Sequence, residues 1–107
     1  MKILRRKRAM AGYLIANYNI TNLEGYQAYI AAVGPTIIAH GGEILVAGPD
    51  SEAVEGDPGA VTVVVKFTSK DALRTWYDSP EYQEIIHHRT DNTEGNMVFA
   101  EEFVMPG

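Results

Sequence analysis

The stretch Ala60-Val-Thr-Val-Val-Val-Lys-Phe67 decides the fold of this 107-residue chain. Its run of β-branched residues ending in a phenylalanine is the strongest strand signal in the sequence. Ser69 follows as an N-cap for a helix that carries Leu73, Trp76 and Tyr77 on one face. The stretch therefore predicts a strand that leads directly into a helix.

Two further strands are predicted before this stretch. Gly12–Ile20 is rich in aromatic and β-branched residues, and Glu43–Ala47 is a short apolar run. The segment Gly48–Gly59 holds two prolines, three glycines and four acidic residues, a composition typical of a loop.

A long helix is predicted between these two strands. Thr21 and Glu24 have the spacing of a capping box. Gly34-Pro35 predicts a kink or a restart of the helix, and Gly41-Gly42 predicts a left-handed cap at its end. The apolar residues at helical spacing, which we expect to face the core, are Leu23, Tyr26, Ile30, Val33 and Ile37.

The end of the chain predicts one more helix and a last strand. Ser79 and Pro80 have the pattern of an N-cap followed by proline at the first helical position, which predicts a short helix over Pro80–Arg89. Asn92–Asn96 is predicted as a turn and Met97–Val104 as the last strand. The order β, α, β, β, α, β predicts an α+β, ferredoxin-like fold, with a four-stranded antiparallel sheet and the helices on one face.

Both faces of the predicted sheet are apolar. The third strand places Val61 and Val65 on one side and Val64 on the other, and the last strand separates Phe99 from Val98 in the same way. A sheet with one solvated face alternates more cleanly between apolar and polar residues. We therefore expect a homodimer in which two copies pack through the open sheet face as a barrel-like core.

The net charge of -5 hides two oppositely charged parts. Five of the nine basic residues lie within residues 1–9, which leaves 4 basic against all 14 acidic residues in the rest, a formal charge of -10. Such a body argues against binding to nucleic acid, which needs a basic face. We interpret residues 1–9 as a basic extension, disordered or not native to the domain, and residues 10–107 as a single domain that begins at Met10.

Several protein classes are excluded by composition. The chain has no cysteine, so disulfides, cysteine zinc sites and thiolate nucleophiles are absent. It carries no secretory signal and no apolar run of the length that a membrane span needs, about 20 residues. We expect a cytoplasmic protein with no membrane partner and no cofactor.

Nucleophiles and metal ligands are few. Of the three serines, Ser69 and Ser79 have cap positions and Ser51 lies in the acidic loop, so each has a structural explanation. His87 and His88 are adjacent on a predicted helix and point about 100 degrees apart, so we expect no metal site. A pocket histidine acting as acid or base remains open, and the pattern slightly favours His87 or the neighbouring Arg89.

Polar side chains in the first and last predicted strands raise the question of which of them are buried. Glu101 and Glu102 follow each other in the last strand, so at least one approaches a covered face and needs a partner, for which Lys66, Arg89 or a tyrosine is available. Asn17 in the first strand poses the same question. Glu101 is therefore a candidate acid or base.

Tyrosines and the single tryptophan gather on or beside the predicted helices. Most belong to the core, but buried tyrosine hydroxyls need partners, and an apolar pocket with such groups is typical of a small-molecule site. The pattern therefore predicts a pocket for a small-molecule ligand between the helices and the sheet. The candidate ligand-binding residues are Trp76, Tyr77, Tyr82, Asn17, Tyr26 and Lys66.

The sequence resembles the family called domain of unknown function 1330 over residues 11–104. The most specific stretch is Trp76-Tyr-Asp-Ser-Pro-Glu-Tyr-Gln83, followed by Arg89. Supporting stretches are Tyr13–Asn17, Tyr26–Tyr29, Gly41–Val46 and Glu55-Gly56. The family motif residues in this chain beyond the aromatic ones are Ser79, Pro80, Glu81 and Gln83.

The resemblance implies a ferredoxin-like subunit of a dimeric α+β barrel, a superfamily that also holds cofactor-free monooxygenases, muconolactone isomerase-like enzymes and stress-induced dimers. It implies no particular reaction. This chain departs from many members at Ala47, where they carry arginine, and at Pro58-Gly59-Ala60, where they carry tryptophan or a basic residue.

Three functions remain open at this point. The first is a protein that binds a small molecule without changing it. The second is a small cofactor-free enzyme, monooxygenase-like or isomerase-like, that uses His or Glu acid-base chemistry. The third is a purely structural or stress-response dimer with no ligand.

Overall fold

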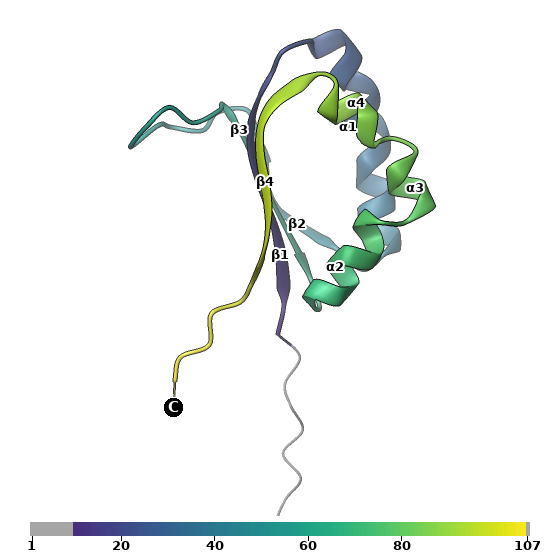
Figure 1. Cartoon of the computed structure of the whole chain (residues 1–107), viewed down its shortest axis with the longest axis vertical. Helices are drawn as coiled ribbons and strands as arrows, with labels where there is room; N and C mark the ends of the chain where they lie inside the picture. Colours follow the sequence, from purple (N-terminus) through teal and green to yellow (C-terminus); the bar gives the residue numbers. More distant parts are fainter. Residues whose placement is uncertain (1–9, 107) are drawn as a thin grey trace, which may run out of the picture.

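The computed structural model describes residues 10–106 and contains one four-stranded antiparallel sheet with helices on one face (Figure 1). The sheet has the order β2-β3-β1-β4, which is the predicted ferredoxin-like βαββαβ topology. The strands are β1 (Gly12–Ile20), β2 (Glu43–Gly48), β3 (Val61–Phe67) and β4 (Thr93–Glu101). The helices are α1 (Leu23–Ala39), α2 (Lys70–Tyr77), α3 (Pro80–Gln83) and α4 (Ile86–Thr90). The basic extension predicted over residues 1–9 lies outside the described residues.

Strand β1 has the predicted bounds and lies in the middle of the sheet. It pairs with β3 on one side and β4 on the other. Its alternation places Leu14, Ala16 and Tyr18 in the core under the helices, where each is at most 3% exposed. Ile15 and Asn17 therefore point to the opposite, open face of the sheet.

Helix α1 begins one residue later than the capping box predicted. Asn22, not Thr21, is the N-cap, and its side chain accepts a hydrogen bond from the backbone N–H of Gly25 at 3.3 Å. The backbone N–H groups of Thr21 and Asn22 instead donate to the carbonyl oxygen of Asn92. This tie to the start of β4 keeps Thr21 outside the helix.

The buried face of α1 also differs from the prediction. Tyr26 and Ile37 are buried as expected, but Leu23 and Ile30 are each 57% exposed. Tyr29 takes a core position in their place, because its ring reaches α3. The helix continues through Pro35 without the predicted restart, and Gly41 provides the left-handed residue after its end, with a φ of 79°.

The predicted helix over 80–89 is two short helices. Ser79 caps α3 as expected: its Oγ accepts from the backbone N–H of Tyr82 at 3.2 Å and donates to the Trp76 carbonyl at 2.7 Å. The chain then turns at Ile85, whose backbone N–H donates to the Tyr82 carbonyl oxygen at 3.0 Å, before α4 begins at Ile86. Ser69 caps α2 as predicted.

Strand β4 begins inside the predicted turn. Thr93 pairs with Ile20, and the ladder continues along β1 to Glu101, which pairs with Gly12. A side chain at Gly95 would collide with the backbone of β1. Gly95, which lies inside the predicted turn, is therefore required by close strand packing.

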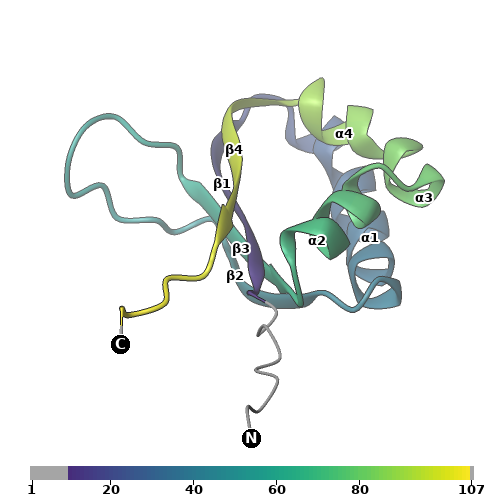
Figure 2. The same ribbon diagram turned by 60° about the horizontal axis from the view of Figure 1, so that its bottom comes forward.

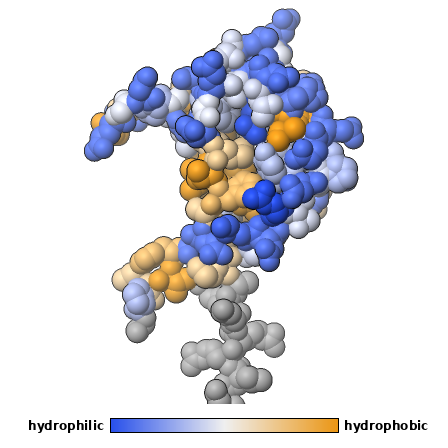
Figure 3. All heavy atoms as spheres, viewed as in Figure 1, coloured by the Kyte–Doolittle hydropathy of each residue, from blue (hydrophilic) through white to orange (hydrophobic). Residues whose placement is uncertain are grey.

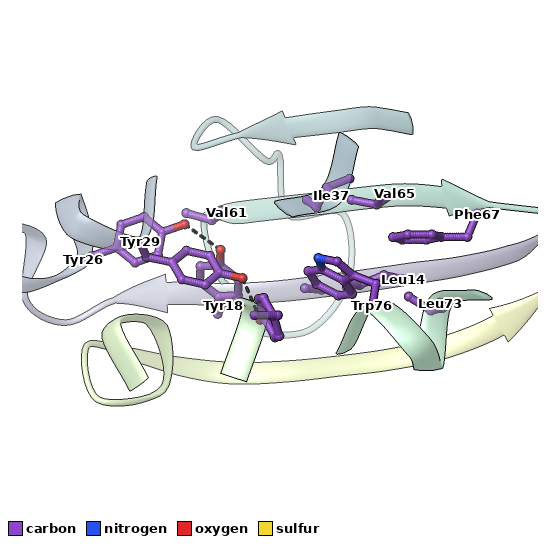
Figure 4. Close-up of a cluster of buried hydrophobic side chains, with 12 residues drawn as sticks. Leu14, Tyr18, Tyr26, Tyr29, Ile37, Val61, Val65, Phe67, Leu73 and Trp76 are labelled. Atoms are coloured by element: carbon purple, nitrogen blue, oxygen red, sulfur yellow. Dashed lines mark hydrogen bonds between the residues drawn. The ribbon is translucent and has the colours of Figure 1, made fainter. Parts of the chain in front are cut away.

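The core lies between the sheet and the helices. Trp76, Tyr82 and Leu73 are fully buried, and Phe67 is 1% exposed. Figure 4 shows tyrosines grouped at one end of this core and Phe67, Leu73 and Trp76 toward the other. No helix within residues 10–106 is long and apolar enough to cross a membrane.

The open face of the sheet carries an apolar row that crosses all four strands. Val46, Val64, Ile15 and Val98 are successive register partners from β2 to β4. Ile15, Val46 and Val98 are 39–53% exposed. Figure 3 shows apolar side chains exposed along β4 beside hydrophilic ones. Figures 1 and 2 show the 49–60 loop and the C-terminal segment projecting on this side, away from the helices.

Candidate functional site

An apolar cavity lies between α1 and the sheet, and we call it the α1 cavity. Its volume is about 230 Å³. It lies among α1, the inward face of β1 and β3, and the edge strand β2, where Ile44 and Ala47 are exposed. Its lining is Leu14, Ala16, Tyr18, Tyr26, Tyr29, Ile30, Val33, Gly34, Ile37, Ile44, Ala47, Val63, Val65 and Met97.

Three tyrosines line the α1 cavity, and their hydroxyls are paired. Tyr18 and Tyr26 have hydroxyl oxygens 2.6 Å apart, and Tyr29 bonds to Tyr82 at 2.8 Å (Figure 4). Burial, followed by the hydrogen bond to Tyr26, raises the pKa of Tyr18 well above its usual range. Burial and the nearby Tyr82 raise the pKa of Tyr29 in the same way. These phenols stay protonated at neutral pH, so they can donate hydrogen bonds but do not serve as bases.

Arg89 contacts the pair formed by Tyr29 and Tyr82. It comes from α4, is only 9% exposed, and donates from Nε to the Tyr82 hydroxyl at 3.4 Å. Its guanidinium carbon lies 5.8 Å from the centre of the Tyr29 ring. Burial tends to lower the pKa of Arg89, but the oxygens of Tyr82 and Tyr29 outweigh it, so the group stays charged. The cluster therefore combines neutral donors with one buried positive charge.

The structure does not bring the six candidate ligand-binding residues together in one site. Tyr26 lines the α1 cavity, whereas Tyr77 lines a separate hollow next to β4. Trp76 and Tyr82 are fully buried in the core with ring centres 4.1 Å apart. Trp76 Nε1 donates to Thr36 Oγ1 at 3.0 Å, which ties α2 to α1.

Asn17 and Lys66 lie on the open face of the sheet, away from the α1 cavity. The Asn17 amide donates to the carbonyl oxygens of Gly59 and Val61, and it accepts from the Gly59 N–H at 2.6 Å. Asn17 therefore holds the end of the 49–60 loop. Lys66 is exposed beside Tyr13, its register partner on β1.

The candidate acid-base groups His87 and Glu101 are both exposed. His87 packs on His88 with ring centres 4.0 Å apart, and Glu101 lies at the end of β4. Within the described residues, no group of three or more His, Asp or Glu side chains gathers that could hold a metal ion.

The motif residues around Pro80 shape the backbone. Ser79 caps α3, Pro80 occupies its first turn, and Glu81 is exposed. Gln83 donates from its side chain to the Tyr77 carbonyl oxygen at 2.6 Å. The motif thus fixes the position of Tyr82 relative to α2.

Sequence reasoning did not single out Tyr18, Tyr29 or Met97 as site residues. The alternation of β1 places Tyr18 on the same face as Leu14, which was an available signal. Tyr29 comes one helical turn after Tyr26. Met97 offered no local signal, because its role depends on how β4 pairs with β1.

Comparison with known proteins gives the family. The profile of the family described as domain of unknown function (DUF1330) matches residues 11–103. The chain belongs to the DUF1330 family. Comparison with proteins of curated function gave no match.

Solved structures resemble this DUF1330 protein in fold. RPA0582, a protein of unknown function from Rhodopseudomonas palustris, superposes with a TM-score of 0.76 at 16% identity, over 92% of this chain and 86% of that one. SnoaB, a cofactor-independent oxygenase from Streptomyces nogalater, gives a TM-score of 0.65 at 9% identity, over 91% and 97%. At these identities the likeness concerns the fold alone. The DUF1330 chain therefore shares its α+β fold with RPA0582 and SnoaB.

Proposed function

We propose that this DUF1330 protein binds a small, largely apolar organic molecule in the α1 cavity. The observation that carries the proposal is the lining of the cavity, which is apolar except for three tyrosines with paired hydroxyls. Ligand sites in proteins are typically concave and apolar, with a few fixed polar groups that orient the ligand. The α1 cavity has this composition.

Binding without chemistry is favoured over acid-base catalysis. No histidine or carboxylate of the described residues lines the α1 cavity. The phenols that do line it include Tyr18 and Tyr29, whose pKa values are raised. General base catalysis needs a group that accepts a proton near neutral pH. The residues here suit holding and orienting a ligand.

We further propose that the protein works as a dimer formed through the open sheet face. The apolar row of Val46, Val64, Ile15 and Val98 would be covered by the same row of a second copy. The 49–60 loop and the C-terminal segment project on the same side and would flank that copy (Figure 2). Covering this face removes exposed apolar area from water.

Filling the cavity tests the binding proposal. The probe is 1-naphthol, a neutral apolar molecule with one hydroxyl, and the readout is the thermal shift of the protein. Ala47 is exposed at the cavity edge on β2, so Ala47→Phe adds a ring there without overpacking the core. The matched control is Ala31→Phe, because Ala31 is exposed on α1 and does not line the cavity.

We expect 1-naphthol to stabilise the wild-type protein and Ala31→Phe in a saturable way, and Ala47→Phe much less. Equal stabilisation of all three proteins would contradict the placement in the α1 cavity. No saturable stabilisation of the wild type would contradict the proposed function itself.

A further inference from the structure

A cleft along β4 gathers most of the positive charge of the body of the chain. Two adjoining hollows of about 650 and 220 Å³ share Arg89, Thr90 and Met97, and together we call them the β4 cleft. Lys70 and Arg74 line the larger hollow as well. These three cations are three of the four basic residues beyond position 9.

No acidic residue of the described part of the chain lines either hollow. This is unusual in a protein whose body carries 14 acidic residues. A concave surface lined by charges of one sign concentrates ions of the opposite sign. The β4 cleft is therefore a positive region within an acidic protein, and it favours an anionic ligand.

Arg89 supplies the buried charge of the β4 cleft. The side chain is 9% exposed, and the groups that face it are the neutral hydroxyls of Tyr82 and Tyr29. Neutral hydroxyls satisfy hydrogen bonds but do not balance a positive charge, and a buried charge without a counter-charge is costly. A carboxylate entering the cleft would supply that counter-charge, and a guanidinium binds it with two parallel hydrogen bonds.

The remaining wall of the β4 cleft is apolar and aromatic. Tyr77, Phe99 and Val98 line the larger hollow, and the Arg74 guanidinium carbon lies 4.8 Å from the centre of the Phe99 ring. Such a wall suits the hydrocarbon or aromatic part of an organic acid better than a hydrated inorganic ion.

The β4 cleft and the α1 cavity meet at two side chains. Met97 lines the cavity and both hollows, and Tyr18 lines the cavity and the smaller hollow. Methionine has a flexible side chain, so a shift of Met97 would join the two spaces. A molecule with an apolar body and an acidic end matches this arrangement.

We propose that the β4 cleft binds the carboxylate of an organic acid, with Arg89 as its buried partner and Lys70 and Arg74 at the mouth. The apolar body of the acid lies past Met97 in the α1 cavity. This last placement rests on the proposed function, and the proposal adds the chemical class of the ligand.

The test compares two molecules of nearly the same shape by calorimetric titration. 1-Naphthoate carries the carboxylate and 1-naphthamide is its neutral counterpart. We expect the full-length protein to bind 1-naphthoate about tenfold more tightly, in line with a charge-assisted pair between guanidinium and carboxylate. Inorganic phosphate should compete weakly with 1-naphthoate, because it lacks the apolar body. Equal affinity for both naphthalene compounds, or equal affinity for phosphate, overturns the proposal.

Charge-neutralising variants locate the carboxylate. Lys70→Gln and Arg74→Gln change exposed residues, so we expect both variants to fold. Each should weaken the binding of 1-naphthoate severalfold and leave the binding of 1-naphthamide unchanged. Arg89→Lys keeps the charge but loses the two-pronged geometry, and it should weaken 1-naphthoate further. Lys66→Gln is the matched control, because Lys66 is the fourth cation and lines neither hollow. A loss in Lys66→Gln as large as in Arg74→Gln overturns the assigned site.

The Ala47→Phe variant separates this proposal from the proposed function. A loss of affinity for both naphthalene compounds supports the placement of the apolar body in the α1 cavity. Unchanged binding of 1-naphthoate by Ala47→Phe, with the loss in Arg74→Gln retained, overturns the cavity placement and leaves the anion site standing. Saturable binding of 1-naphthol, with no preference for 1-naphthoate over 1-naphthamide, overturns the anion site and leaves the proposed function of the α1 cavity standing.

Discussion

The hydroxyl oxygens of Tyr29 and Tyr82 lie 2.8 Å apart in the core and join α1 to α3. Tyr82 also accepts from Arg89 Nε, so the pair connects the cavity lining to the buried charge of α4. Tyr29 occupies a position that helical spacing did not place in the core. Tyr82 belongs to the most specific motif of the sequence. This contact connects the α1 cavity with the β4 cleft.

Removing the Tyr29 hydroxyl should destabilise the protein. Tyr29→Phe leaves the buried Tyr82 hydroxyl without this partner, and we expect a loss of ~1–2 kcal/mol in the free energy of unfolding. Urea unfolding followed by the fluorescence of Trp76, the single tryptophan, measures the change. Tyr77→Phe is the control, because the hydrogen bond between Gln83 and Tyr77 uses the backbone carbonyl oxygen of Tyr77, which this change retains. Equal midpoints for the two variants would show that the hydroxyl pair contributes nothing.

The stability of the protein should fall above pH 10. The pKa values of Tyr18 and Tyr29 are raised in the folded state, so both residues bind their protons more tightly there than in the unfolded chain. Their contribution is complete below the unfolded pKa of about 10 and is lost as the pH rises beyond it, by ~1.4 kcal/mol per pH unit for each group. Urea unfolding at successive alkaline pH values measures the slope. Tyr29→Phe should reduce it, and ultraviolet titration in which all six tyrosines ionise near pH 10 would disprove the prediction.

Ser79 should matter more for stability than Ser69. Both serines cap helices, but Ser79 is buried and both accepts from the Tyr82 N–H and donates to the Trp76 carbonyl, whereas Ser69 is half-buried and caps α2. We expect Ser79→Ala to cost ~2 kcal/mol and Ser69→Ala ~1 kcal/mol. Denaturant midpoints check the order. Ser79→Thr retains a hydroxyl and should recover part of the loss, whereas a Ser69→Ala variant less stable than Ser79→Ala would contradict this account of the motif.

The sequence was sufficient for the local features of the fold. The bounds of β1, the caps at Ser69 and Ser79 and the left-handed Gly41 all depend on a few adjacent residues, and all are confirmed. The start of β4 was predicted incorrectly, because Gly95 is typical of a turn while its pairing opposite Tyr18 is a long-range effect. Leu23 and Ile30 are exposed for a similar reason, since the packing of Tyr29 against Tyr82 rotates the buried face of α1.

The candidate site could be predicted only in part. Tyr26, Tyr77 and Arg89 were named from sequence and lie at the cavity or the cleft. Lys70 and Arg74 were not named, because an exposed pair one helical turn apart is ordinary on a helix surface. Their significance comes from the strand opposite, where Phe99 and Val98 complete the wall.

A charge on the open sheet face should prevent dimer formation. Val98 is 53% exposed at the end of the apolar row, and Val98→Asp would place an unpaired carboxylate in the proposed interface. Light scattering at micromolar concentration should give twice the 11.8 kDa chain mass for the wild type and the single mass for Val98→Asp. Ile38→Asp is the control, because Ile38 is 69% exposed on α1, on the side of the sheet that the helices cover, and this variant should remain dimeric. A monomeric wild type would contradict the proposed dimer.

The central claim is that the α1 cavity binds a small apolar molecule, and methyl NMR during a titration with 1-naphthol tests it most directly. The methyl signals of Ile30, Ile37 and Met97, which line the cavity, should shift together and saturate. The methyl signals of Ile38, which is 69% exposed on the same helix and does not line the cavity, should stay in place. Shifts confined to Ile15 and Val64 on the open sheet face, or no saturable shift at all, would contradict the account.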